Sequence, residues 1–247
     1  MTPQPDPYQP IRRTRPPAIN APGVVLALIA LLVVVHLFRV YLSSPATANW
    51  LILNLSFIPG CYGLLDEVCT IRSPGADLWT PASYMLLHGD ALHVGLNSLW
   101  LLVFGTPVAR RLGAQRFMAF SVAGSVAGAL LFFLANPSLV APVIGASGAV
   151  SALMGGASRF ALPRSGGAGF MRARTDLPLE PIRSCLTNRT VLVFVAVFFA
   201  TNLLFSTGLG GAFGPGNVAW EAHLGGFVFG FLGFALFDRR NGRTSQL

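Results

Sequence analysis

The stretch HLGGFVFGFLG, residues 223–233, decides the fold, because it is apolar apart from one histidine and contains no charged residue. It belongs to an apolar run over about 217–237, which is long enough for a helix that crosses roughly 30 Å of hydrocarbon. Gly226 and Gly230 form a GxxxG pair, and His223 precedes Gly226 by one helical turn. Small residues at this spacing let two helix backbones approach closely. We therefore expect a membrane-spanning helix that packs through Gly226 and Gly230 and carries His223 on its packing face.

Five further apolar stretches have a similar length, with approximate bounds 23–41, 91–108, 117–135, 143–162 and 191–206. Hydrophobic residues make up 53% of the 247-residue chain and charged residues only 11%, against about 25% charged residues in a soluble domain. The sequence thus predicts an all-α polytopic membrane protein with six transmembrane helices. Its net charge of +8 is divided among arginine clusters between the apolar runs, so it does not indicate nucleic-acid binding.

The arginine clusters also predict the orientation, because Lys and Arg are enriched in loops that stay in the cytoplasm. Clusters precede the first apolar run and follow the second, fourth and sixth, whereas the alternate loops hold only Arg72. Both termini are therefore expected in the cytoplasm. We expect a disordered proline-rich tail at 1–21, a six-helix membrane domain at 22–238 with a long outside loop at 42–90, and a basic tail at 239–247. The compact chain and the use of arginine for every basic residue favour a bacterial plasma (inner) membrane.

The outside loop contains Cys61 and Cys69, while Cys185 falls on the cytoplasmic side. An oxidising compartment would permit a disulfide between the first two. Their spacing in the sequence does not show that they meet in space, so two unpaired thiols are an equal alternative.

Polar side chains recur in the outer half of three predicted spans. Ser147 lies roughly 6 Å and His223 roughly 9 Å below the outer surface, at a rise of about 1.5 Å per residue. His93 and Asn97 are four residues apart on one helix face, in a third span that also enters from outside. Polar groups in hydrocarbon are costly and usually functional. We therefore expect a site at this depth.

These residue types are suited to nucleophilic acyl transfer. A serine hydroxyl needs a base to remove its proton, and histidine is the usual one. His93, the amide of Asn97 and the backbone N–H of Ser147 can donate hydrogen bonds to an oxyanion. Glu221 lies two residues from His223, on another helix face, so we expect a Ser147–His223 dyad. Gly148 and other small residues beside the serine would allow close packing against the histidine.

A metal site is the rival interpretation of the histidines. Zinc binds three or four protein ligands, but the outer layer offers only His88, His93 and His223, and the apolar stretches contain no cysteine and no acidic residue other than Glu221, at the outer end of the sixth. We therefore expect no metal. His36 is expected to be a packed histidine.

Four motifs carry a resemblance to a known family: GASG at 145–148, HVGLN at 93–97, LLHGD at 86–90 and AHLGGFVFG at 222–230. Over about 23–237 the sequence resembles the rhomboid intramembrane serine proteases. The resemblance implies Ser147 as nucleophile, His223 as general base and then acid, and His93, Asn97 and the Ser147 N–H as oxyanion donors. It also implies cleavage of transmembrane segments of other membrane proteins near the outer face, without a cofactor. The moving parts implied are a lateral gate at 191–206 and a cap at 207–215.

Two positions depart from the family pattern. Ser151 stands where many members have an aromatic residue packed on the catalytic histidine, and Thr80 follows Trp79 where many have arginine. The alternative function is accordingly a catalytically weak rhomboid-like protein that binds or escorts transmembrane clients. Loss of the serine or the histidine would be its mark in the sequence, and both are present. A transporter would need an acidic residue buried in a span, whereas Glu221 lies at the outer end of the run 217–237. The sequence leaves the oligomeric state open.

Overall fold

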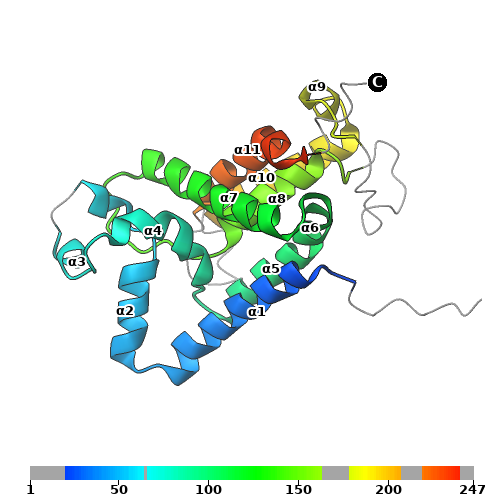
Figure 1. The fold of residues 1–247 in the computed structure, drawn as a ribbon. Helices are drawn as coiled ribbons and strands as arrows, with labels where there is room; N and C mark the ends of the chain where they lie inside the picture. The colour runs from blue at the N-terminus through cyan, green and yellow to red at the C-terminus, as the bar shows by residue number, and fades with distance from the viewer. Residues whose placement is uncertain (1–19, 64–65, 163–177, 207–218, 240–247) are drawn as a thin grey trace, which may run out of the picture.

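The computed structural model of the chain describes residues 20–63, 66–162, 178–206 and 219–239. Three predicted segments lie wholly or largely outside these residues: the tails at 1–21 and 239–247 and the cap at 207–215. The described helices follow one another in the order shown in Figure 1: α1 Gly23–Leu37, α2 Pro45–Leu55, α3 Glu67–Thr70, α4 Ala76–Ser83, α5 Ala91–Trp100, α6 Thr106–Leu112, α7 Ala114–Ala135, α8 Ser147–Ser158, α9 Ile182–Cys185, α10 Arg189–Ser206 and α11 Trp220–Phe237. Single π-helical turns extend α1 to Leu42 and join α5 to α6.

Four of the described helical segments are long and apolar enough to cross a membrane, namely Gly23–Leu42, Ala91–Leu112, Ala114–Ala135 and Trp220–Phe237. The prediction of an all-helical, polytopic membrane protein is therefore confirmed over the described residues. The stretches 143–162 and 191–206 instead hold α8 and α10, of which α10 is a shorter apolar helix. The count of six spans and the placement of the termini stay predictions.

Helix α8 is shorter than its apolar stretch because it starts late and is surrounded by protein. The chain before it is non-helical, and Gly145 has a φ of +123°. All residues from Gly148 to Ser158 are buried. A helix enclosed by other helices does not face lipid, so its length is not set by the thickness of the bilayer.

Helices α7, α8 and α11 form the centre of the bundle and meet through glycines. A Cβ placed on Gly226 would collide with the carbonyl of Gly148, and one on Gly230 with the carbonyl of Ala152. Since both contacts advance by four residues along both helices, α8 and α11 run parallel. Helix α7 runs antiparallel to them, and a Cβ on its Gly128 would lie 2.7 Å from the Ala222 carbonyl oxygen.

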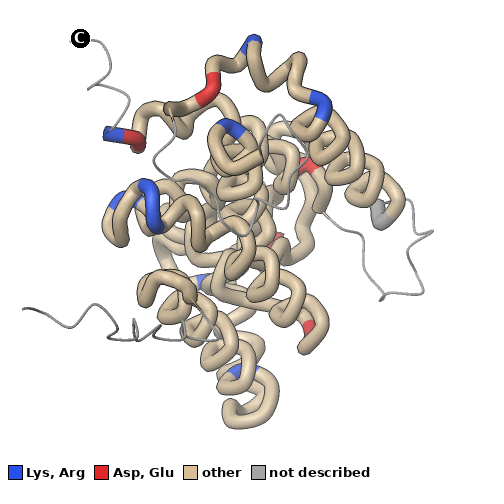
Figure 2. The backbone as a smooth tube through the Cα atoms, turned by 90° about the vertical axis from the view of Figure 1, so that its right-hand side faces the viewer, with Lys and Arg blue, Asp and Glu red and all other residues tan. Residues whose placement is uncertain are grey.

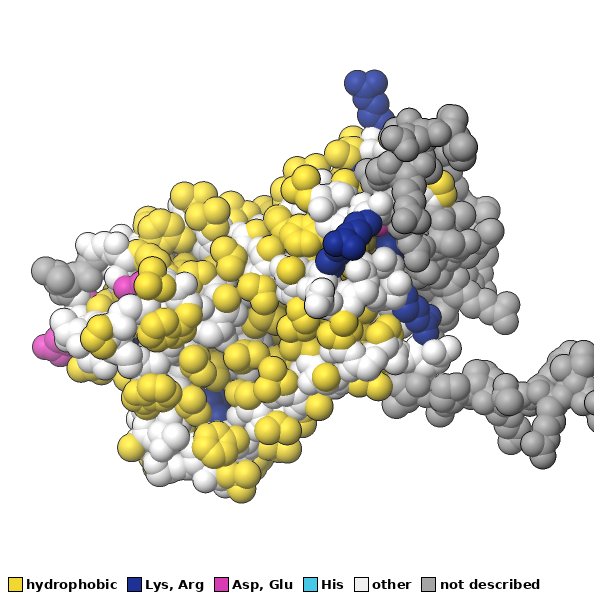
Figure 3. All heavy atoms as spheres, viewed as in Figure 1, with side chains coloured by type: hydrophobic (Ala, Val, Ile, Leu, Met, Phe, Trp, Pro, Cys, Tyr) yellow, Lys and Arg dark blue, Asp and Glu magenta, His cyan; other side chains and the backbone are white. Residues whose placement is uncertain are grey.

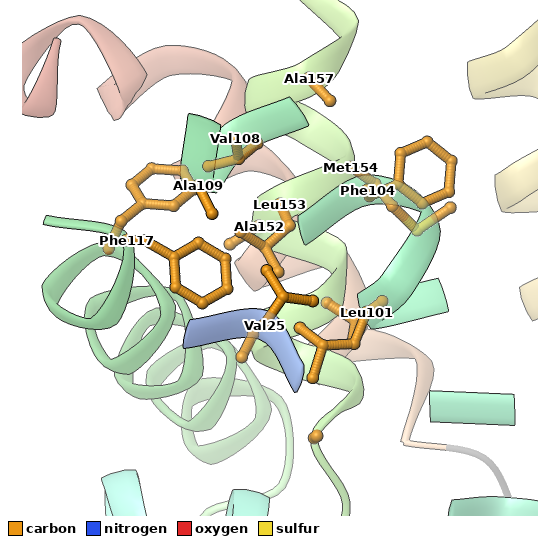
Figure 4. Close-up of a cluster of buried hydrophobic side chains, with 14 of the residues drawn as sticks. Val25, Leu101, Phe104, Val108, Ala109, Phe117, Ala152, Leu153, Met154 and Ala157 are labelled. Carbon is orange, nitrogen blue, oxygen red and sulfur yellow. The ribbon is translucent and has the colours of Figure 1, made fainter. Parts of the chain in front are cut away.

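Apolar side chains from the surrounding helices pack against the side of α8, as Figure 4 shows. Val25 comes from α1, Leu101 and Phe104 from the π-helical turn after α5, and Phe117 from α7. They contact small and medium residues of α8, among them Ala152. This packing fixes the direction of α8 relative to the rest of the bundle.

Most of the charged residues lie toward the two ends of the molecule. In Figure 3 most Lys and Arg side chains gather toward the end where α6 and α9 lie, and Asp and Glu side chains lie at the opposite end near α3. Figure 2 shows the helices tan, without charged residues, along most of their length. At the arginine-rich end, Arg111 donates two hydrogen bonds to Asp238, of 2.9 and 2.6 Å, and both side chains are 1% exposed. This buried ion pair joins α6 to the end of α11.

Polar contacts and a disulfide hold the loop at 42–90. Cys61 and Cys69 form a disulfide, with their Cα atoms 5.3 Å apart, which settles the alternative that the sequence left open. The buried guanidinium of Arg72 contacts the Asp77 carboxylate at 2.7 Å and donates to the hydroxyl of Thr80 at 3.3 Å. Arg72, eight residues before Thr80, thus contacts the side chain that follows Trp79. The departure at Thr80 leaves the loop braced.

Candidate active site

Ser147 is the first residue of α8 and stands at the accessible end of a buried helix. The two residues before it are held by hydrogen bonds: Gly145 N–H donates to the Tyr84 carbonyl at 3.0 Å, and Ala146 N–H donates to His88 Nε2 at 3.3 Å. Ser147 itself is half-buried, whereas the rest of α8 is buried. Because the first N–H groups of a helix have no partner within it, the Ser147 N–H is available to a bound group.

His93 of α5 lies against the turn that precedes the serine. A Cβ on Gly145 would lie 2.7 Å from His93 Nε2 and 3.7 Å from Ser147 Oγ. Only glycine satisfies both this spacing and the positive φ at residue 145. His93 Nδ1 accepts the N–H of Gly89 at 3.4 Å, which places the ring proton of the neutral imidazole on Nε2. A donor N–H therefore faces the region beside the Ser147 hydroxyl.

Asn97 is buried one turn further along α5. Its Nδ2 donates to the His93 carbonyl at 3.0 Å, so part of the amide is used within the helix. The amide nitrogen of Asn97 carries two protons. One is used in the bond to the His93 carbonyl, and the other is available to a bound group.

His223 of α11 is brought to the start of α8 by the glycine contact between the two helices. Gly226 packs on Gly148, the residue after the nucleophile candidate, and His223 lies one turn before Gly226. Among the described residues, no hydrogen bond joins the Ser147 hydroxyl to His223. Catalytic hydrogen bonds are often loose without substrate and tighten in the reacting complex.

The amide of Asn202, on α10, accepts a hydrogen bond from His223 Nδ1. Sequence reasoning did not single out this residue. Its signal was available, because Asn202 is the one amide in the stretch 191–206, whose other polar side chains are the hydroxyls of Thr201 and Ser206.

Two further residues that sequence reasoning did not assign to the site support the turn before Ser147. Tyr84 holds Gly145 through its carbonyl and donates its hydroxyl to the Ser125 carbonyl of α7 at 3.0 Å. His88 is fully buried, and its ring lies edge-on to that of His93 with centroids 5.0 Å apart. His88 falls within the LLHGD motif, but no sequence pattern predicts its contact with the Ala146 N–H.

Burial lowers the pKa of His88 to about 3, and neighbouring His93, His36 and Arg39 act in the same direction. The His88 imidazole is therefore neutral across the physiological range. Only the neutral ring has a free Nε2 lone pair, which the contact with Ala146 requires.

Replacing His88 by Gln is expected to make stability less dependent on pH. Below about pH 6.5 the unfolded chain protonates this imidazole, whereas the folded protein resists protonation down to about pH 3. The unfolded state then binds more protons, so the free energy of unfolding falls by up to about 1.4 kcal/mol per pH unit on acidification. Thermal unfolding of parent and His88→Gln protein between about pH 7 and pH 5 measures the difference. Parallel profiles for the two proteins would contradict this prediction.

No group of three or more His, Cys, Asp or Glu side chains among the described residues is arranged to hold a metal ion.

The described residues form a polytopic helical membrane protein in which a half-buried serine starts α8, with His93 of α5 beside the turn that precedes it and His223 of α11 hydrogen-bonded to Asn202 of α10. The sequence pattern of the Rhomboid domain matches residues 75–239. The chain therefore belongs to the rhomboid family.

Named relatives share parts of this region. Human rhomboid-related protein 3 is 39% identical over 79 residues, which is 32% of this chain and 19% of the relative. Mouse rhomboid-related protein 2 is 29% identical over 150 residues, 60% of this chain and 47% of the relative. Rhomboid protease GluP of Bacillus subtilis is 27% identical over 157 residues, 64% of this chain and 25% of the relative. The chain thus spans less than half the length of these relatives.

The family and the apolar helices identify an integral, multi-pass membrane protein. The relatives come from mammals and yeast as well as from a bacterium. They do not single out the bacterial plasma membrane that the arginine usage favoured.

Proposed function

We propose that this protein is an intramembrane serine endopeptidase that cleaves transmembrane segments of other membrane proteins near the outer face of the bilayer. The observation that carries the proposal is the arrangement at the start of α8. There, a half-buried serine hydroxyl has the Nε2 of His93 nearby, and the Gly226–Gly148 contact fixes the helix of His223 beside it.

In the proposed reaction, His223 Nε2 takes the proton of Ser147 as Oγ attacks the carbonyl carbon of the scissile bond. The resulting oxyanion accepts hydrogen bonds from the Ser147 N–H, the His93 Nε2–H and the second amide proton of Asn97. Protonated His223 then gives its proton to the leaving amine as the C–N bond breaks. Water hydrolyses the acyl-enzyme in the same way and restores the serine. A general base contributes about 10²–10⁴ in rate, and one oxyanion donor about 10²–10³.

The wider arrangement that we propose follows the charge pattern. Residues 22–238 form the membrane protease domain with six spans and both termini in the cytoplasm. Single-pass membrane proteins are its substrates, and the reaction uses no cofactor. The arginine-rich end in Figure 3 agrees with this orientation, since positive charge is retained on the cytoplasmic side.

One observation favours the alternative, a catalytically weak rhomboid-like protein that binds or escorts transmembrane clients. Ser151, one turn after Ser147 on α8, is a buried hydroxyl in the place of a ring that would pack on the histidine. The two functions differ in the reactivity of Ser147, because a binding protein does not need an activated hydroxyl.

Covalent labelling tests this difference directly. A fluorophosphonate probe is expected to modify Ser147 of the parent protein in liposomes, and mass spectrometry of the peptide locates the adduct. Ser147→Ala is expected to remove the label, and His223→Ala to reduce it strongly, because the hydroxyl then lacks its base. Ser151→Ala is the matched control on the same helix and is expected to label like the parent. A parent protein that stays unlabelled while it binds transmembrane peptides would favour the alternative.

A further inference from the structure

Asn202 is a buried amide on α10 that faces the catalytic candidate of α11. Its exposed fraction is 8%. One turn earlier on α10, Phe198 stacks on Phe227, with ring centroids 5.2 Å apart, and Phe227 lies one turn after His223 on α11. The two contacts, Phe198 with Phe227 and Asn202 with His223, therefore belong to one antiparallel helix interface.

The two hydrogen bonds of the Asn202 side chain determine which atom meets the imidazole. Its Nδ2 donates to the Phe198 carbonyl of the same helix at 2.7 Å. Oδ1 is therefore the atom that meets His223 Nδ1, and a carbonyl oxygen only accepts hydrogen bonds. His223 Nδ1 must carry the proton, which leaves the lone pair of the neutral ring on Nε2.

We propose that Asn202 is a positioning residue that fixes the tautomer and the orientation of His223 as the general base. This inference rests on the proposed protease function. It assigns to an amide on α10 the task that a third group performs wherever a base needs to be oriented toward its nucleophile. It also accounts for the serine at position 151. An imidazole that is held by its hydrogen bond to Asn202 does not need an aromatic side chain of α8 to keep its orientation.

Kinetic variants separate positioning from a role in folding. Asn202→Leu keeps the approximate shape of the side chain and removes the acceptor. It is expected to lower kcat for a reporter transmembrane substrate about tenfold or more while KM changes less than about twofold. Asn202→Asp keeps an acceptor oxygen and is expected to stay within about threefold of the parent at about pH 8, where a free imidazole is neutral. Thr201→Val is the matched control, because the Thr201 hydroxyl bonds only to carbonyls of its own helix, and we expect parent kinetics.

A parent-like kcat for Asn202→Leu would overturn the proposal, as would equal losses in Asn202→Leu and Asn202→Asp, which indicate a structural role. Cleavage that persists in Ser147→Ala would instead overturn the protease function itself.

A spectroscopic measurement tests the contact without using turnover. Nitrogen-15 spectra of histidine-labelled protein report which ring nitrogen carries the proton. The His223 signals are assigned as those that disappear in His223→Gln. In the parent we expect these signals to show a neutral ring protonated at Nδ1. In Asn202→Leu this preference is expected to weaken, with Nε2-protonated ring appearing. A parent spectrum with His223 protonated at Nε2 would overturn the inference whether or not the protein is a protease.

Discussion

Ser147→Ala, His223→Ala and the variant carrying both changes are expected to show the same residual cleavage, roughly 10⁴-fold or more below the parent. The two side chains act as one unit, since the base is useless without the hydroxyl and the hydroxyl is weak without the base. Effects of such residues are strongly non-additive. Cleavage of a reporter transmembrane segment in liposomes, followed by gel analysis of the products, measures all three.

Ser151→Ala is the control on the same helix and should leave activity within a few-fold of the parent, because its hydroxyl is buried one turn away from the reacting atoms. A double variant much slower than either single variant would show that the two residues contribute separately. That result would contradict the dyad.

Gly226→Ala is expected to destabilise the protein by about 2–3 kcal/mol or more and to remove most of its activity. The added methyl group would collide with the carbonyl of Gly148, so the backbones of α8 and α11 would have to separate. Overpacking of this kind typically costs about 1–3 kcal/mol, and contact with a backbone atom cannot be relieved by a side-chain rotation. Because Gly148 follows Ser147, the same shift moves the serine away from His223. Thermal unfolding in detergent and the liposome assay measure the two effects.

Gly233→Ala supplies the matched control on α11. A Cβ there would lie 3.4 Å from the Phe229 side chain, a flexible group at near-ordinary contact distance. Alanine also favours a helix by up to about 1 kcal/mol over glycine. We expect this variant to melt within a few degrees of the parent. Equal losses in both variants would contradict the close-packing argument.

The apolar stretches were sufficient to predict the long helices, because a lipid-facing helix must be both long and apolar. They were not sufficient for α8. Its residues are apolar because they face other helices. Composition alone does not distinguish a helix that is buried in protein from a helix that faces lipid. The late start of α8 depends on the backbone at Gly145, which a sequence pattern does not reveal.

For the candidate site, comparing depths predicted the group of Ser147, His223 and His93, and the structure brings the helices that carry them together. The amide of Asn202 is visible in the sequence, but its contact with His223 could not be obtained in this way. It depends on the rotation of α10 about its own axis, and the long apolar helix carries little amphipathic pattern to fix that rotation. The contact of His88 with the Ala146 N–H could not be predicted either, because it links segments more than fifty residues apart.

The buried pair of Arg111 and Asp238 has a consequence for the order in which the protein is assembled. Ribosomes make α6, α7 and α8 well before α11, so the new chain holds the Arg111 guanidinium in the membrane region before Asp238 exists to bond it. The glycine face of α8 likewise has no α11 to cover it during this interval. Completion of α11 provides the carboxylate for Arg111, the cover for α8 and the imidazole for Ser147 in one step. The proposed hydrolytic activity is thereby delayed until the bundle has closed.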